Sequence, residues 1–293
     1  AEFGPLALKA VRQTLIDAGQ SRTTVNKNVA RLKRAFGWAV GEELVPASVS
    51  HALREVPGLK RGRSAARETE PVRPVADEAV EAVRPFLRPQ LWAMVELQRL
   101  TGMRPGEVCS MRARDIDTTG ELWEYRPAHH KNSFRGHDRV VVIGPRARAI
   151  LEPFLSRDLD AYLFQPAECE AARSAARRRA RKTPLWPSHR RPARTRANLR
   201  ERYSTTAYAR AIRRACDRAF PPPPDLSKDK VKAWRRAHRW SPNQLRHTAA
   251  TLIRRRYGLE AAQSVLGHAH ASVTEVYAES NRQLAREVAA RVG

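Results

Sequence analysis

The chain has 293 residues, enough for one large domain or two modest ones with a proper hydrophobic core. Its formal net charge of +25 and its pI near 11.2 are too basic for a typical metabolic enzyme and favour a polyanionic partner, nucleic acid ahead of a membrane surface. No run of eighteen or more apolar residues is present, so we expect neither a membrane span nor a membrane partner.

The N-terminal part predicts a small helical domain. Apolar residues recur every three to four positions over Ser21–Val40 with basic residues between them, which is typical of an amphipathic helix with a basic face. A second short helix is expected over Ala47–Val56. Residues 58–75 show no hydrophobic period, so we assign 1–57 to a helical domain and 58–75 to a linker. The first residues resemble the middle of a helical domain, and we expect the chain to be a fragment.

Residues 76–293 predict a second, larger domain. Helical spacing continues over Asp77–Leu87 and Gln90–Leu100. Pro105 fits the first turn of a further helix, which places Arg104 just before that helix begins.

The middle of this domain changes its pattern twice. Apolar runs shorten to Leu122–Tyr125 and Val140–Ile143 with turn-like sequences between them, which predicts a small antiparallel sheet. Residues 168–202 are rich in arginine and contain few large apolar side chains, so we expect a solvated basic insertion or DNA-facing arm there. From Thr205 onward helical patterns return, are broken by Pro221–Pro224, and resume over Pro242–Tyr257, Leu259–Leu266 and Ser272–Val288.

The cysteines indicate a reducing compartment. Cys109, Cys169 and Cys216 are odd in number and lack the paired spacing of a zinc site or of a disulfide framework. We therefore expect a cytoplasmic protein that uses neither a metal nor any other cofactor.

Several side chains of the second domain fit the cleavage of a phosphodiester without a metal. That reaction needs a nucleophile, cations on the non-bridging oxygens and an acid for the leaving oxygen. The C-terminal sequence SPNQLRHTAAT contains Arg246, and VLGHAHASVTEVYAE contains His268 and, nine residues later, Tyr277. Upstream, TGMRPGEV contains Arg104, and Lys131 lies between the two strand-like runs.

These motifs, in this order and spacing, resemble those of the tyrosine recombinases, the phage integrase family, over residues 75–290. The resemblance implies a mostly α fold with a small antiparallel β-sheet: an integrase-like catalytic domain preceded by a helical core-binding domain that clamps DNA. Residues 1–57 supply that first domain only in part. The implied partners are double-stranded DNA and further copies of the chain, in a homo-tetramer on paired DNA sites.

The resemblance also implies a reaction. Tyr277 attacks a DNA phosphate, forms a 3′-phosphotyrosine and releases a 5′ hydroxyl, which then attacks the partner duplex. Arg104 and Arg246 hold the phosphate oxygens, since forked guanidinium groups match a phosphate. His268 adds a hydrogen bond, and Lys131 protonates the leaving oxygen.

One position departs from the family pattern. Asn243 stands three residues before Arg246, where the family most often has histidine. An amide still donates a hydrogen bond to a phosphate oxygen but does not accept a proton as imidazole does, so a slower enzyme is expected.

Other interpretations stay open at this point. Taken singly, a tyrosine placed like Tyr277 is more often a packing residue than a nucleophile, and a hairpin lysine like Lys131 is usually just solvated. Two alternatives share the fold: a DNA-binding protein that no longer cleaves, and a type IB topoisomerase. A basic RNA-binding protein is disfavoured because aromatic residues make up only 6% of the chain and no aromatic RNA-binding strands are evident.

Overall fold

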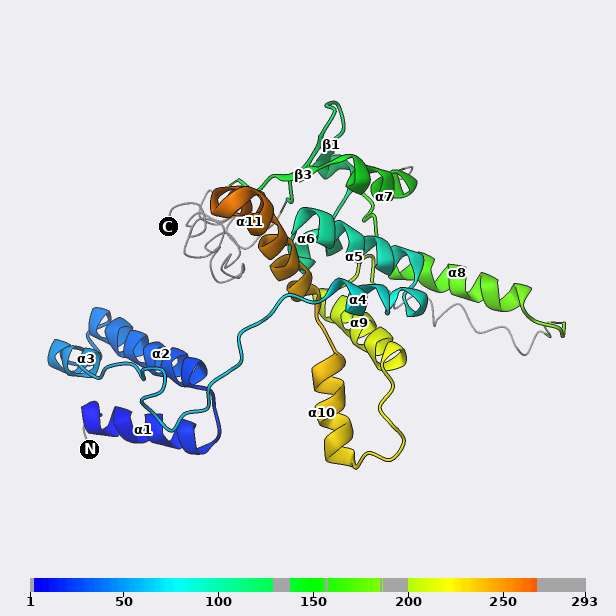
Figure 1. Ribbon diagram of the computed structural model, residues 1–293. Coiled ribbons are helices and arrows are strands. Elements are labelled where there is room, and N and C mark those ends of the chain that lie inside the picture. Colours follow the sequence, from blue (N-terminus) through cyan, green and yellow to red (C-terminus); the bar gives the residue numbers. More distant parts are fainter. Residues whose placement is uncertain (1–2, 129–137, 156–157, 185, 187–199, 268–293) are drawn as a thin grey trace, which may run out of the picture. The chain divides into compact units, whose positions relative to one another are not determined.

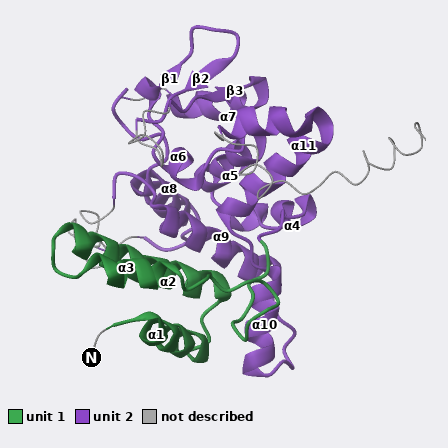
Figure 2. Ribbon diagram, turned by 90° about the vertical axis from the view of Figure 1, so that its left-hand side faces the viewer, with its two compact units in different colours: residues 1–71 green, residues 72–293 purple. Residues whose placement is uncertain are grey.

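The computed structural model describes residues 3–128, 138–155, 158–184, 186 and 200–267 (Figure 1). It divides into two units, residues 1–71 and 72–293, which Figure 2 shows in different colours. No helix in these described ranges is both long enough and apolar enough to cross a membrane.

The first unit contains three helices in its described part, α1 (Pro5–Asp17), α2 (Arg22–Gly41) and α3 (Ala47–Arg54). The helices predicted over 21–40 and 47–56 are confirmed as α2 and α3, whereas α1 was not predicted. Ser21 caps α2 by accepting a hydrogen bond from the backbone N–H of Thr24. One small core unites the helices, formed by Leu8, Val25, Val29, Leu53 and Val56.

Of the basic residues predicted on α2, Arg31 and Arg34 are exposed, whereas Lys33 donates a hydrogen bond to the Val56 carbonyl. Lys27, Arg31 and Arg34 are all exposed and recur at the spacing of one helix face, while Val25 and Val29 are buried. This helix therefore presents cations to solvent along one side of the first unit.

The residues after α3 pack on α2. The side-chain amide of Asn26 accepts a hydrogen bond from the Leu59 backbone N–H (2.8 Å) and donates one to the Leu59 carbonyl (3.0 Å). Arg22 pairs with Glu68 at 2.6 Å. Part of the segment 58–75 thus belongs to the first unit, and the boundary between the units follows Pro71.

The second unit is mainly helical. Its elements, in chain order, are α4 (Asp77–Glu81), η1 (Arg84–Phe86), α5 (Pro89–Thr101), α6 (Pro105–Cys109), η2 (Ala113–Asp115), β1 (Ile116–Asp117), β2 (Trp123–Tyr125), β3 (Val141–Ile143), α7 (Pro145–Leu155), α8 (Pro166–Arg179), α9 (Thr205–Ala219), α10 (Lys228–His238) and α11 (Pro242–Leu266). Many of these helices begin with proline, whose fixed φ and missing N–H suit a first helical turn.

The predicted small sheet is confirmed. β2 pairs antiparallel with both β1 and β3, and Trp123 and Tyr125 lie opposite Ile143 and Val141. These side chains are buried on the face that joins the main core, while Val142 between them is exposed. The strands follow the expected alternation, with one face on the core.

Helix α5 is central to the second unit. It packs against α7 and α11, and its many buried residues include Met94, Val95 and Leu97. It ends at Gly102, whose φ of 63° is the left-handed conformation that glycine adopts most easily. A Cβ at this position would lie 2.9 Å from the Leu266 side chain, so α5 and the end of α11 approach closely here.

Three helices of this unit had no counterpart in the sequence analysis: α7, α8 and α10. Helix α8 occupies the start of the basic segment 168–202, because alanine, glutamate and arginine are strong helix formers. It is mostly exposed, and Cys169 is its buried residue. Gln90 donates to Glu168 at 2.7 Å, which fixes α8 to the start of α5.

Candidate active site

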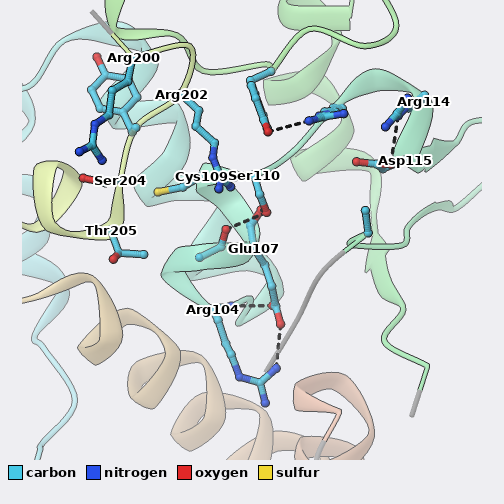
Figure 3. Close-up of a pocket in the computed structure, with 15 residues that line it drawn as sticks. Arg104, Glu107, Cys109, Ser110, Arg114, Asp115, Arg200, Arg202, Ser204 and Thr205 are labelled. Atoms are coloured by element: carbon cyan, nitrogen blue, oxygen red, sulfur yellow. Dashed lines mark hydrogen bonds and ion pairs between the residues drawn. The ribbon is translucent and has the colours of Figure 1, made fainter. Parts of the chain in front are cut away.

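The first predicted arginine lies at the start of α6. Arg104 is the N-cap residue, and its backbone N–H donates to Glu107 Oε2 at 2.7 Å. The Arg104 side chain turns back to the same carboxylate, with Nη1 donating to Oε1 at 2.7 Å (Figure 3). Glu107 therefore fixes both the backbone and the guanidinium of Arg104.

Glu107 is a buried anion between two cations. It is 3% exposed, and the Nε of Arg139, just before β3, lies 3.5 Å from its Oε1. Burial by itself raises the pKa of Glu107, but the charges of Arg139 and Arg104 and the hydrogen bonds from Arg104 outweigh it, so the pKa lies below its usual value. The carboxylate stays ionised and holds Arg104 with a charge-assisted hydrogen bond.

The second predicted arginine, Arg246, is 1% exposed on α11. Its Nη1 donates to the Gly102 carbonyl at 2.6 Å and its Nη2 to the Leu266 carbonyl at 2.7 Å. These two carbonyls end α5 and α11, where helix dipoles favour a cation. The Arg246 guanidinium thus bonds two turns that lead to predicted site residues. Gly102 lies two residues before Arg104, and Leu266 lies two residues before His268.

Asn243 lies in the first turn of α11 and is exposed. Its position three residues before Arg246 places both on one side of the helix. Its amide has no hydrogen-bond partner within the described ranges, which leaves it available to a ligand.

Three predicted site residues fall outside the described residues. Lys131 belongs to the segment between β2 and β3, and His268 and Tyr277 follow Gly267, the last described residue. Through the Gly102 carbonyl the structure links Arg246 to the turn that precedes Arg104, and Asn243 lies on the same helix as Arg246. For the other three residues the roles stay predictions.

A cavity of about 630 Å³ opens beside Arg104. Its lining contains five arginines, drawn in Figure 3 with their neighbours: Arg104, Arg112, Arg114, Arg200 and Arg202. The ring of Tyr162 lies between two of them, 4.4 Å from the Arg112 guanidinium carbon and 5.1 Å from that of Arg202. Such a wall suits an extended polyanion with several phosphates.

Two thiol and hydroxyl groups of this cavity, those of Cys109 and Tyr203, are poor nucleophiles. Burial raises the pKa of the Cys109 thiol to about 12, so it stays protonated at neutral pH. Burial also raises the pKa of the Tyr203 hydroxyl well above its usual value. In the described ranges no cluster of three His, Cys, Asp or Glu side chains suited to a metal ion occurs. The five arginines make positive charge the main feature of this cavity.

The sequence profile of the phage integrase family matches residues 77–283. The chain belongs to the phage integrase family. It is 28% identical to a tyrosine recombinase XerC of Corynebacterium efficiens, over 96% of this chain and 75% of that protein. It is 26% identical to a tyrosine recombinase XerC of a Mycobacterium species, over 94% of this chain and 79% of that protein.

A solved structure shares the fold of this chain. The Tn1549 transposon integrase in complex with a circular intermediate DNA is similar with a TM-score of 0.61 at 15% identity, over 99% of this chain and 86% of that chain. This likeness confirms the predicted fold class, mostly α with a small antiparallel sheet. Members of the phage integrase family are enzymes that cut and rejoin DNA, and this chain is one of them.

Sequence reasoning missed several residues of this integrase-family site. Glu107 was not among the predicted site residues, although its position three residues after the cap Arg104 is the capping-box spacing. Arg112, Arg202 and Tyr162 carried no signal, because the cavity wall joins segments that are far apart in the chain.

Proposed function

We propose that the protein is a site-specific DNA recombinase that cleaves and rejoins strands through a 3′-phosphotyrosine at Tyr277. The observation that carries the proposal is the convergence of Arg104 and Arg246. Arg246 bonds the Gly102 carbonyl, two residues before Arg104, and Arg104 opens onto an arginine-lined cavity. Two fixed guanidinium groups at one place are suited to the charge that develops on a phosphate under attack.

The two arginine side chains are held by different groups, and we assign them different roles toward the phosphate. Arg104 is partly exposed and lines the cavity, so it meets the phosphate directly. Arg246 is buried and clamped by the two carbonyls, so its charge is fixed in place before the substrate arrives. Preorganised charge of this kind needs no rearrangement during the reaction, which lowers the barrier.

The remaining roles follow from the family resemblance. Tyr277 is the nucleophile, His268 donates a hydrogen bond to the phosphate, and Lys131 protonates the leaving 5′ oxygen. Asn243 donates a hydrogen bond where most relatives have histidine; its exposed amide supports this role. No metal or other cofactor takes part in the proposed reaction.

The proposal extends to domains, partners and location. We assign the first unit, predicted as residues 1–57, to a DNA-clamping domain, supported by the basic face of α2. Of the linker predicted over 58–75 only the residues after Pro71 stay outside this unit. Residues 76–293 form the proposed catalytic domain, with its basic insertion at 168–202. Double-stranded DNA is the substrate, and a homo-tetramer pairs two sites. The buried, free cysteines Cys109, Cys169 and Cys216 support a reducing cytoplasmic setting.

Trapping the covalent intermediate tests the proposal. The protein is incubated with sheared genomic DNA that carries the flanks of its own gene, denatured with detergent, and the protein-linked DNA is sequenced. We expect wild-type adducts at one recurring sequence and none with Tyr277→Phe. Sequence-specific binding without any adduct favours the non-cleaving alternative, and relaxation of supercoils without site preference favours the topoisomerase.

A further inference from the structure

Arg139 is a buried cation outside the predicted set of site residues. It is 6% exposed and stands two residues before the start of β3. Its Nη1 donates to the carbonyl of Val265, in the last turn of α11, and to that of Val140, both at 3.1 Å. Its Nε lies 3.5 Å from Oε1 of Glu107.

These contacts reach three segments that carry predicted site residues. Glu107 holds Arg104, Val265 lies three residues before His268, and Arg139 itself follows the segment that contains Lys131. One side chain therefore connects α6, the end of α11 and the start of β3.

Gly267 shows how closely Arg139 fits the end of α11. A Cβ built on Gly267 would lie 2.6 Å from Nη1, 3.1 Å from Cδ and 3.3 Å from Cζ of Arg139. The φ of Gly267 is 61°, so the helix ends in the left-handed conformation under the guanidinium. Any larger residue here would move either Arg139 or the chain that leads to His268.

Stability alone does not explain this arginine. Its Nε and Nη2 are buried without a hydrogen-bond acceptor among the described residues, and it shares a single carboxylate with Arg104. Leaving such donors unsatisfied is costly, and apolar side chains of similar volume often replace buried ion pairs without loss of stability. A buried charge in this position is better explained by the geometry that it imposes on its neighbours.

We propose that Arg139 is a positioning residue of the recombination site. It fixes Glu107, and through it Arg104, in a defined place relative to the end of α11. This inference rests on the proposed function for its effect on catalysis, but the geometric part stands on the contacts themselves.

The test compares two variants. Arg139→Met has a side chain of similar length without a charge, and Arg139→Lys keeps the positive charge but lacks the planar guanidinium and its several N–H donors. Arg84→Met is the control, because Arg84 is 65% exposed on η1. We expect Arg139→Met to melt near the wild-type temperature and to bind DNA with an affinity within about threefold of the wild type. Its single-turnover cleavage rate at saturating protein should fall about 100-fold, because misplacing a catalytic group by about 1 Å costs a factor of this order. Arg139→Lys should recover part of the rate.

A double-mutant cycle separates positioning from a merely structural role. If Arg139 acts through Glu107, adding Arg139→Met to the Glu107→Gln variant should lower the cleavage rate only slightly further. The rate losses of the two single variants then do not multiply. Wild-type cleavage by Arg139→Met, or losses that multiply fully, would overturn the proposal.

Hydrogen exchange gives a readout that needs no cleavage. In Arg139→Met the backbone amides of Arg104–Val108 and of the last turn of α11 should exchange at least about tenfold faster, while those of the first unit stay unchanged. Unchanged exchange at both places overturns the proposal even if the wild-type enzyme forms no adduct. Absence of an adduct with altered exchange would instead reject the proposed function alone.

Discussion

Arg246 Nη1 donates a 2.6 Å hydrogen bond to the carbonyl of Gly102, 144 residues away in the chain. The bond joins α11 to the turn between α5 and α6, and so links the sequence motifs of the two predicted arginines. Because the guanidinium also bonds the Leu266 carbonyl, it stabilises the fold as well as supplying charge to the site.

Arg246→Met should therefore impair both stability and catalysis. Two buried carbonyls lose their donors, and each unsatisfied group costs about 1–3 kcal/mol, so we expect the free energy of unfolding to fall by about 2–6 kcal/mol. Cleavage should fall by at least about 100-fold where the protein is still folded. Urea unfolding and single-turnover cleavage measure the two effects. A stable variant that cleaves normally would contradict the role of this bond.

Tyr277→Phe should bind DNA like the wild type and form no covalent adduct, because only the nucleophilic hydroxyl is lost. Tyr257→Phe is the matched control, since Tyr257 is 67% exposed on α11 and should keep full activity. Electrophoretic mobility shift and adduct trapping give the two readouts. Adduct formation at the wild-type level by Tyr277→Phe would reject the assignment.

Elements with a clear hydrophobic period were predicted well. Helices α2 and α5 and the strands β2 and β3 each place apolar residues on one face or in one short run, so the pattern shows them directly. Helix α8 was not predicted, because its arginine-rich sequence was interpreted as a solvated segment, although its alanines and glutamates favour a helix.

The site was predictable as a set of residue types and not as a geometry. Sequence motifs named Arg104 and Arg246, but they did not indicate that Arg246 is buried, at 1% exposed. The role of Arg139 was beyond sequence reasoning, because its carbonyl partner Val265 lies 126 residues away. Contacts of this separation leave no local pattern.

The pKa of Glu107 predicts a pH dependence of stability. Its folded value lies below the ordinary 4.5, so the ion pair stabilises the fold above that pH and the contribution is lost as pH falls through the folded value. Glu107→Gln should therefore be less stable than wild type at pH 7, and the difference should shrink below pH 4.5. Urea unfolding between about pH 3 and 7 measures it. A constant difference across this range would contradict the ionised state.

Chelation should leave cleavage intact, because the proposed reaction draws its positive charge from Arg104 and Arg246. The experiment measures adduct formation before and after dialysis against EDTA, with a magnesium-dependent nuclease as the control that the chelator works. Loss of the adduct with EDTA and its return with magnesium would contradict a metal-free reaction.

Helix α10 should contribute to DNA affinity through charge. Lys232, Arg235 and Arg236 are exposed, lie on one side of the helix and form no ion pair with another described residue. Each phosphate contact releases counterions, so binding should weaken steeply as salt rises between about 50 and 200 mM. Replacing all three with glutamine should reduce the slope of log K against log salt by about two to three.

The control for α10 is Arg84→Gln, a single exposed arginine on η1 that is not expected to touch DNA. Fluorescence anisotropy with one labelled duplex at several salt concentrations gives all three slopes under the same conditions. Because the cavity arginines are unchanged in the triple variant, its cleavage rate at saturating protein should match the wild type. An unchanged salt slope would place α10 outside the DNA interface, and a lowered cleavage rate at saturation would give this helix a part in catalysis that its charges alone do not explain.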